Sequence, residues 1–96
     1  MKITEYNLRL KIKELLEELK ELEQIYSIEE CEEYSQTQVL KGYLTHASYV
    51  DKQFESKEGI SNIRFLAESL KKAIDSIRFS INQKNKQTEE IEEERE

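Results

Sequence analysis

The sequence predicts an all-α protein, and three observations favour this class. The chain of 96 residues contains no proline and only two glycines, Gly42 and Gly59, so the residues that most often interrupt helices are scarce. Charged residues make up 38% of the chain and hydrophobic residues 36%, a balance typical of long, solvent-exposed helices. Apolar residues recur in steps of four and three, and no alternating run of β-branched residues predicts a strand.

The first helix is predicted from about Thr4, a candidate N-cap, to about Tyr26. Its apolar residues follow an unbroken ladder of four- and three-residue steps, which Leu16 and Ile25 widen. Such a ladder places one hydrophobic stripe along the helix and indicates that the helix packs on a partner helix. The ladder consists of Leu8, Ile12, Leu15, Leu19, Leu22 and Tyr26.

A turn between two long helices is predicted within residues 32–38, where the apolar period disappears. Before it, Ser27 and Glu30 have the spacing of a capping box, which marks either a new helix or a helix that passes through the serine. A second apolar run begins at Val39 and continues to Phe54 with the same four- and three-residue steps. This run predicts a helical second half of the chain.

The apolar register changes between Phe54 and Ile60. Two interpretations remain open. Either a helix ends there with Gly59 as its left-handed cap and a third helix begins near Ile60, or one long helix runs through with an irregularity. The change of register favours the interruption. The final apolar ladder comprises Ile63, Leu66, Leu70, Ile74 with Ala73, Ile77 and Ile81.

Together these elements predict an antiparallel helical hairpin of two long amphipathic helices over residues 1–88. A three-helix arrangement is the alternative if the second half is broken near Gly59. Residues 89–96 hold six acidic residues, one isoleucine and one arginine, and this acidic tail is predicted to be disordered. Because so short a chain buries only a modest core, we expect the hairpin to complete a bundle with a partner or by self-association.

Two aromatic residues, Phe65 and Phe79, lie beside the final ladder and two heptads apart. A helix with apolar residues on two flanks needs two neighbours, so these side chains are covered either by a third helix over residues 39–54 or by another chain. We therefore expect the partner to be another helical protein or a second copy of this chain. The residues predicted to bind it are Leu8, Ile12, Leu15, Leu19, Leu22, Ile63, Phe65, Leu66, Leu70, Ile74, Ile77, Phe79 and Ile81.

No motif in the sequence predicts catalysis, a cofactor or a metal ion. His46 is the only histidine and has no second ligand at metal-binding spacing. Cys31 is the only cysteine, so it has no disulfide partner within the chain. The expected class is therefore a protein without enzymatic activity, cofactors or a small-molecule substrate.

The formal net charge of −6 disfavours nucleic acid as a partner, because phosphate contacts require clustered positive charge. Glu68 and Lys72, and likewise Lys71 and Asp75, have the spacing of ion pairs on a solvated helix face. No apolar run approaches the roughly 18 residues of a membrane-spanning helix. We expect a cytoplasmic protein with no membrane insertion, or one exported without a cleaved signal peptide as part of a complex.

The length, the helical pattern and the two amphipathic segments around a polar middle resemble those of the WXG100/ESAT-6-like proteins of type VII secretion. The resemblance is closer to the small helical partner proteins of LXG toxins, which lack the Trp-x-Gly turn, as this chain does. It implies a protein that pairs with the helical N-terminal region of a toxin and helps to target it to the secretion machinery. The letters of the family's export motif, Tyr-x-x-x-Asp/Glu, occur at Tyr26 and Glu30, in the first half of the chain and not after the last helix.

The function expected from the sequence is that of a non-enzymatic helical adaptor that targets another helical protein, such as a type VII secretion substrate. The alternative is a self-associating coiled-coil regulator, or a small phage or plasmid inhibitor that occludes its target. In that alternative, the acidic cluster of residues 29–33 and the acidic tail mimic nucleic acid towards a basic protein. Binding through these carboxylates would weaken steeply with ionic strength, whereas pairing through the apolar stripes would not.

Overall fold

A computed structural model describes residues 3–94 of the chain, with side chains from residue 4 to residue 83. Within this range the chain is helical and contains no strand, so the prediction of an all-α protein is confirmed. The helices are α1 (Ile3–Ile25), a short 3-10 turn η1 (Ile28–Glu30), α2 (Tyr34–Thr45), α3 (Ala47–Gln53) and α4 (Lys57–Glu94).

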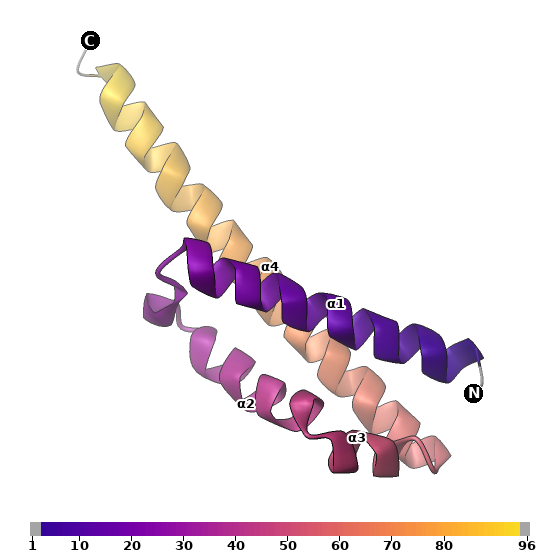
Figure 1. Ribbon diagram of the computed structural model, residues 1–96. Coiled ribbons are helices and arrows are strands. Elements are labelled where there is room, and N and C mark those ends of the chain that lie inside the picture. The colour runs from indigo at the N-terminus through magenta and orange to yellow at the C-terminus, as the bar shows by residue number, and fades with distance from the viewer. Residues whose placement is uncertain (1–2, 95–96) are drawn as a thin grey trace.

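The helices form an elongated bundle of 61 × 23 × 20 Å (Figure 1). α1 and α4 run in the same direction, and α2 and α3 run back between them in chain order (Figure 1). α4 packs against each of the other three helices and is the longest element, with 38 residues. Its C-terminal part extends beyond the end of α1 and away from the rest of the bundle (Figure 1).

This arrangement does not confirm an antiparallel hairpin of two long helices. The chain reverses direction twice within the described residues, and the two long helices α1 and α4 end up parallel (Figure 1). The interruption of the second half, which the three-helix alternative requires, is present between Gln53 and Lys57. The division into a domain of residues 1–88 and a tail of residues 89–96 stays a prediction, since the side chains after residue 83 lie outside the described range.

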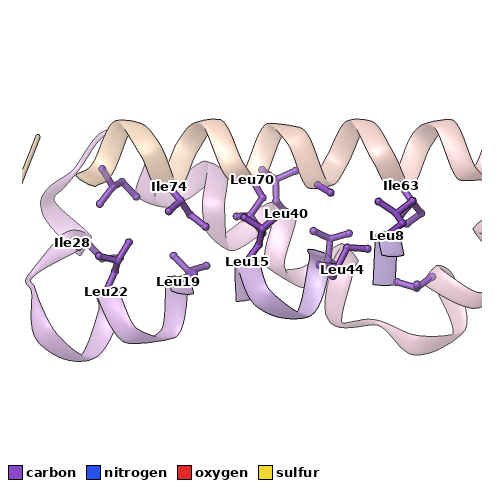
Figure 2. Packing of buried hydrophobic residues seen from close by; sticks show 14 residues of the cluster. Leu8, Leu15, Leu19, Leu22, Ile28, Leu40, Leu44, Ile63, Leu70 and Ile74 are labelled. Atoms are coloured by element: carbon purple, nitrogen blue, oxygen red, sulfur yellow. The ribbon is translucent and has the colours of Figure 1, made fainter. Parts of the chain in front are cut away.

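The core forms where the ladders of α1 and α4 meet (Figure 2). Leu8 lies opposite Ile63, Leu15 opposite Leu70 and Leu19 opposite Ile74, and the three pairs share the same offset in residue number. The two ladders are therefore in register, and we call this paired surface the α1–α4 seam. α2, α3 and η1 add further side chains to the same cluster. These are Ile28, Leu40, Leu44 and Val50.

One position of the final ladder differs from the prediction. Ala67 is fully buried, with 0% of its surface exposed, whereas Leu66 is only partly buried. A step of four residues from Ile63 turns the helix by about 40° from the seam, whereas a step of three turns it by about 60° the other way. Ala67 therefore faces the seam, and Leu66 lies at its edge.

The break before α4 also differs in detail from the prediction. Gly59 is not a left-handed cap, because no described residue has a positive φ. It lies in the first turn of α4, where its N–H donates a hydrogen bond of 3.0 Å to Ser56 Oγ, the N-cap arrangement. A Cβ at Gly59 would lie 1.9 Å from the carbonyl oxygen of Gln53, so this position needs glycine for the close approach of two backbone segments.

The first turn lies earlier in the chain than predicted. α1 ends at Ile25 and α2 begins at Tyr34, so most of residues 32–38 is helical. Thr37 within this segment is fully buried, and its hydroxyl donates a hydrogen bond of 2.6 Å to the carbonyl oxygen of Tyr34. Ser27 makes no side-chain cap hydrogen bond, so the capping-box spacing does not begin an α-helix here.

Candidate partner-binding surfaces

The structure places the predicted partner-binding residues in three different environments. Phe65 and Phe79 are exposed, with 68% and 63% of their surface accessible. Leu66 and Ile81 are partly buried and pack against the core. The others lie inside the core of this chain itself, and they are Leu8, Ile12, Leu15, Leu19, Leu22, Ile63, Leu70, Ile74 and Ile77.

The outer face of α4 carries the two exposed phenylalanines. Because successive residues of an α-helix are about 100° apart, Phe65 and Phe79 point away from the side that Ile63, Leu70 and Ile77 bury. α2 and α3 do pack on α4, yet they leave both aromatic rings exposed. In place of one helix over residues 39–54 the structure has α2 and α3, separated at His46, and they do not cover these two side chains.

A groove of about 800 Å³ runs between α1 on one side and α2 and α3 on the other. Its apolar lining comes from Ile12 and Leu16 of α1, Leu44 of α2, and Ala47 and Val50 of α3. We call it the α1/α2–α3 groove. Its charged rim comprises Arg9, Lys13, Glu17, Lys20, Glu23, Glu29, Lys41 and Asp51.

Arg9 joins the two sides at one end of the groove. Its guanidinium donates hydrogen bonds to Asp51 Oδ1 at 2.9 Å and to Glu5 Oε1 at 3.0 Å. The same group stacks on Phe54, with 4.5 Å between Arg9 Cζ and the ring centroid. The hydrogen bond to Asp51, and to a lesser degree that to Glu5, raises the pKa of Arg9 above its ordinary value. The charged form is thus stabilised where α1 meets α3.

Glu23 joins α1 to α2 at the other end of the groove. Its Oε1 lies 3.7 Å from Lys41 Nζ and accepts a hydrogen bond of 3.3 Å from the side-chain amide of Gln38. Partial burial raises the pKa of the neighbouring Tyr34, and the carboxylates of Glu23 and Glu29 raise it further. The groove therefore has an apolar floor, polar bridges at both ends and cations and anions in equal number along its rim.

A smaller apolar hollow of about 420 Å³ lies on the outside of the α2–α3 joint. It is lined by Tyr43 and Tyr49, whose ring centroids lie 5.4 Å apart, and by Gly42, where a Cβ would meet no atom within 4 Å. His46 also lines the hollow, and its Nδ1 accepts a hydrogen bond of 3.2 Å from the Tyr49 N–H. His46 therefore acts as the cap of α3.

The described residues contain no group of three or more His, Cys, Asp or Glu side chains arranged to hold a metal ion. None of the described helices combines the length and the hydropathy needed to cross a membrane. Comparisons with models of known protein families, with curated proteins and with solved structures gave no match.

The sequence did not predict the groove or the hollow. Leu16, which widens the first ladder, was the available signal for the groove, since a residue beside a ladder faces a second neighbour. The hollow depends on the break at His46, where no change of apolar register marks the end of a helix.

Proposed function

We propose that this protein is a non-enzymatic helical adaptor that binds an amphipathic helix of another protein in the α1/α2–α3 groove. The observation that carries the proposal is the groove itself, an apolar floor bounded by charged rims on two helical walls. Amphipathic helices are commonly bound in such grooves, with residues at i, i+3, i+4 and i+7 on the floor. The bound helix would be the fourth of the bundle.

The length of the groove matches a helix of about four turns. Arg9 and Glu23, which mark its two ends, are separated by about 21 Å along α1 at roughly 1.5 Å per residue. Along this length the rim mixes both signs of charge, with Lys13 and Lys20 on either side of Glu17. A complementary helix would carry aliphatic residues toward Leu16 and flanking residues of both charges. The partner is thus a mixed-charge amphipathic helix and not a uniformly basic or acidic segment.

The resemblance to the helical partner proteins of LXG toxins supports a specific kind of partner. In that reading, the bound helix belongs to the N-terminal region of a type VII secretion substrate, and the adaptor helps to target it. The adaptor would then act in the cytoplasm, or leave the cell within the complex.

The test is co-expression with the helical regions encoded by neighbouring genes, followed by a binding titration with purified proteins. Leu16→Glu places a charge on the groove floor and should weaken binding by at least about tenfold, as expected at an interface hot spot. Leu10→Glu is the matched control, because Leu10 is an exposed leucine of the same helix that does not line the groove. Thermal unfolding verifies that both variants are folded. Equal binding by the two variants would exclude the groove as the binding site.

The exposed phenylalanines of α4 favour a second candidate, a self-associating coiled-coil regulator or a small phage or plasmid inhibitor that occludes its target. An inhibitor that works through the carboxylates of residues 29–33 would lose affinity steeply as salt is raised. An adaptor that binds through the groove floor would not. A salt series on the same complex therefore separates the two candidates.

A further inference from the structure

We infer that His46 is a pH-sensitive cap whose protonation releases the N-terminus of α3. The inference goes beyond the adaptor function and does not depend on it. His46 lies between α2, which ends at Thr45, and α3, which begins at Ala47. Its backbone is extended there, with φ −82° and ψ 97°. The break between the two helices is therefore centred on this residue.

The cap requires one particular form of the imidazole ring. Nδ1 of His46 accepts a hydrogen bond of 3.2 Å from the Tyr49 N–H. A ring nitrogen accepts a hydrogen bond only while it carries no proton, so the neutral ring must hold its proton on Nε2. In the charged ring both nitrogens are donors. Protonation therefore removes the acceptor that caps α3.

The surroundings of the ring do not offset a positive charge. The hollow that His46 lines contains Tyr43 and Tyr49, and tyrosine is neutral near pH 7. No side chain of α1 or α4 lines this hollow within the described part of the chain. The charged residues of α2 and α3 are Lys41, Asp51 and Lys52, and none of them lines it either. The charged ring therefore meets only the partial positive charge of the α3 N-terminus, which repels it.

α3 depends strongly on this cap because it has only seven residues. A helix so short is marginal in water, and loss of an N-cap raises its opening equilibrium between about twofold and thirtyfold. α3 contributes the buried Val50 to the core and Asp51 to the bridge with Arg9. Its release therefore also loosens one wall of the α1/α2–α3 groove. The cap is intact above about pH 7.5 and is lost as the pH falls through roughly 6.5, where histidine gains its proton.

The first test is amide hydrogen exchange of the full chain, followed by NMR at pH 7.5 and pH 5.5. Histidine is the one side chain whose unperturbed charge changes in this range, and His46 is the only histidine. The protection factors of the α3 amides should fall between about twofold and thirtyfold on acidification, while those of α1 stay constant. His46→Asn is the matched control, because asparagine caps helices without titrating. Protection that is independent of pH in the unmodified chain overturns the inference, and so does an equal fall in His46→Asn.

The second test needs no variant. Long-range proton–nitrogen NMR correlations of the single histidine ring reveal which nitrogen carries the proton. At pH 7.5 the proton should be on Nε2, and a proton on Nδ1 overturns the cap. On acidification, protonation of Nδ1 and loss of protection at Tyr49 should share one midpoint. Two separate midpoints overturn the link between the ring and α3.

Discussion

The α1–α4 seam and the α2–α3 segment pack on the same helix but are built in different ways. The seam joins two long helices through ladders that stay in register over several turns (Figure 2). The α2–α3 segment consists of helices of 12 and 7 residues, separated at His46 and followed by a break before Lys57. Helices this short are marginal in water, so they depend on tertiary packing and on caps. The comparison suggests that burial stabilises the seam, whereas the α2–α3 segment also requires specific polar and backbone contacts.

Truncation at the centre of the seam should have the largest effect. Leu70 has none of its surface exposed, so Leu70→Ala should lower the free energy of unfolding by about 2–5 kcal/mol. Phe65→Ala on the opposite face of α4 should change it by less than about 0.5 kcal/mol in the monomer. Urea denaturation at low protein concentration measures both. A similar loss from the two substitutions would mean that the seam is not the main source of stability.

The close approach at the α3–α4 break should be nearly as sensitive. Gly59→Ala forces the Gln53 carbonyl away from the new Cβ and should destabilise the chain by about 1–3 kcal/mol. Gly42→Ala is the control, because a Cβ there meets no atom within 4 Å and alanine favours the helix by roughly 0.5–1 kcal/mol. The melting temperature should therefore fall for Gly59→Ala and rise for Gly42→Ala. If both shift it in the same direction, the contact with Gln53 is not decisive.

Removal of the cap of α4 should have a moderate effect. Ser56→Ala loses the acceptor for the Gly59 N–H and should cost about 1 kcal/mol. Ser27→Ala serves as a comparison, since Ser27 makes no side-chain cap hydrogen bond and its removal should cost much less. Guanidinium denaturation of the two variants resolves the difference. An equal loss of unfolding free energy in the two variants would indicate that the cap hydrogen bond of Ser56 is not the reason for its effect.

The ion pair across the seam should contribute least. Arg78 Nε lies 2.6 Å from Glu18 Oε1, but both side chains are substantially exposed, so water and salt screen the attraction. A double-mutant cycle with Arg78→Ala and Glu18→Ala should give a coupling energy of about 0–1 kcal/mol. A coupling energy well above this range would mean that electrostatic attraction, as well as apolar burial, stabilises the seam.

The sequence predicts the helices of the seam well because the steps of their ladders are a local property of the chain. The burial of the ladder residues between Leu8 and Leu22 and between Ile63 and Ile77 could be predicted without knowledge of the tertiary structure. The relative direction of these helices could not be predicted in the same way, since a ladder of four- and three-residue steps packs in either orientation. The relative direction of the two helices depends on how many times the chain reverses between their ladders. The sequence left the number of reversals open, because it did not decide whether the chain is broken near Gly59.

The surfaces were less predictable than the core. Nothing in the apolar pattern from Tyr43 to Phe54 indicates that the helix ends at Thr45, because the ladder continues in phase across His46. After this ending, α3 begins with a hydrogen bond from the Tyr49 N–H to the His46 ring, a cap that becomes recognisable only in three dimensions. The α1/α2–α3 groove likewise depends on the distance between two helices. Phe65 and Phe79 are both exposed, and the second neighbour that their positions beside the ladder indicate stays a prediction.

The parallel course of α1 and α4 gives the bundle an electrical polarity. The peptide dipoles of two long helices add along its axis, and those of the shorter α2 and α3 oppose them only in part (Figure 1). One end of the bundle therefore has the partial positive charge of two helix N-termini. A helix in the groove that ran antiparallel to α1 would reduce this imbalance. The electric field of the helix dipoles thus favours a partner helix that lies in the groove antiparallel to α1 over one that lies parallel to it.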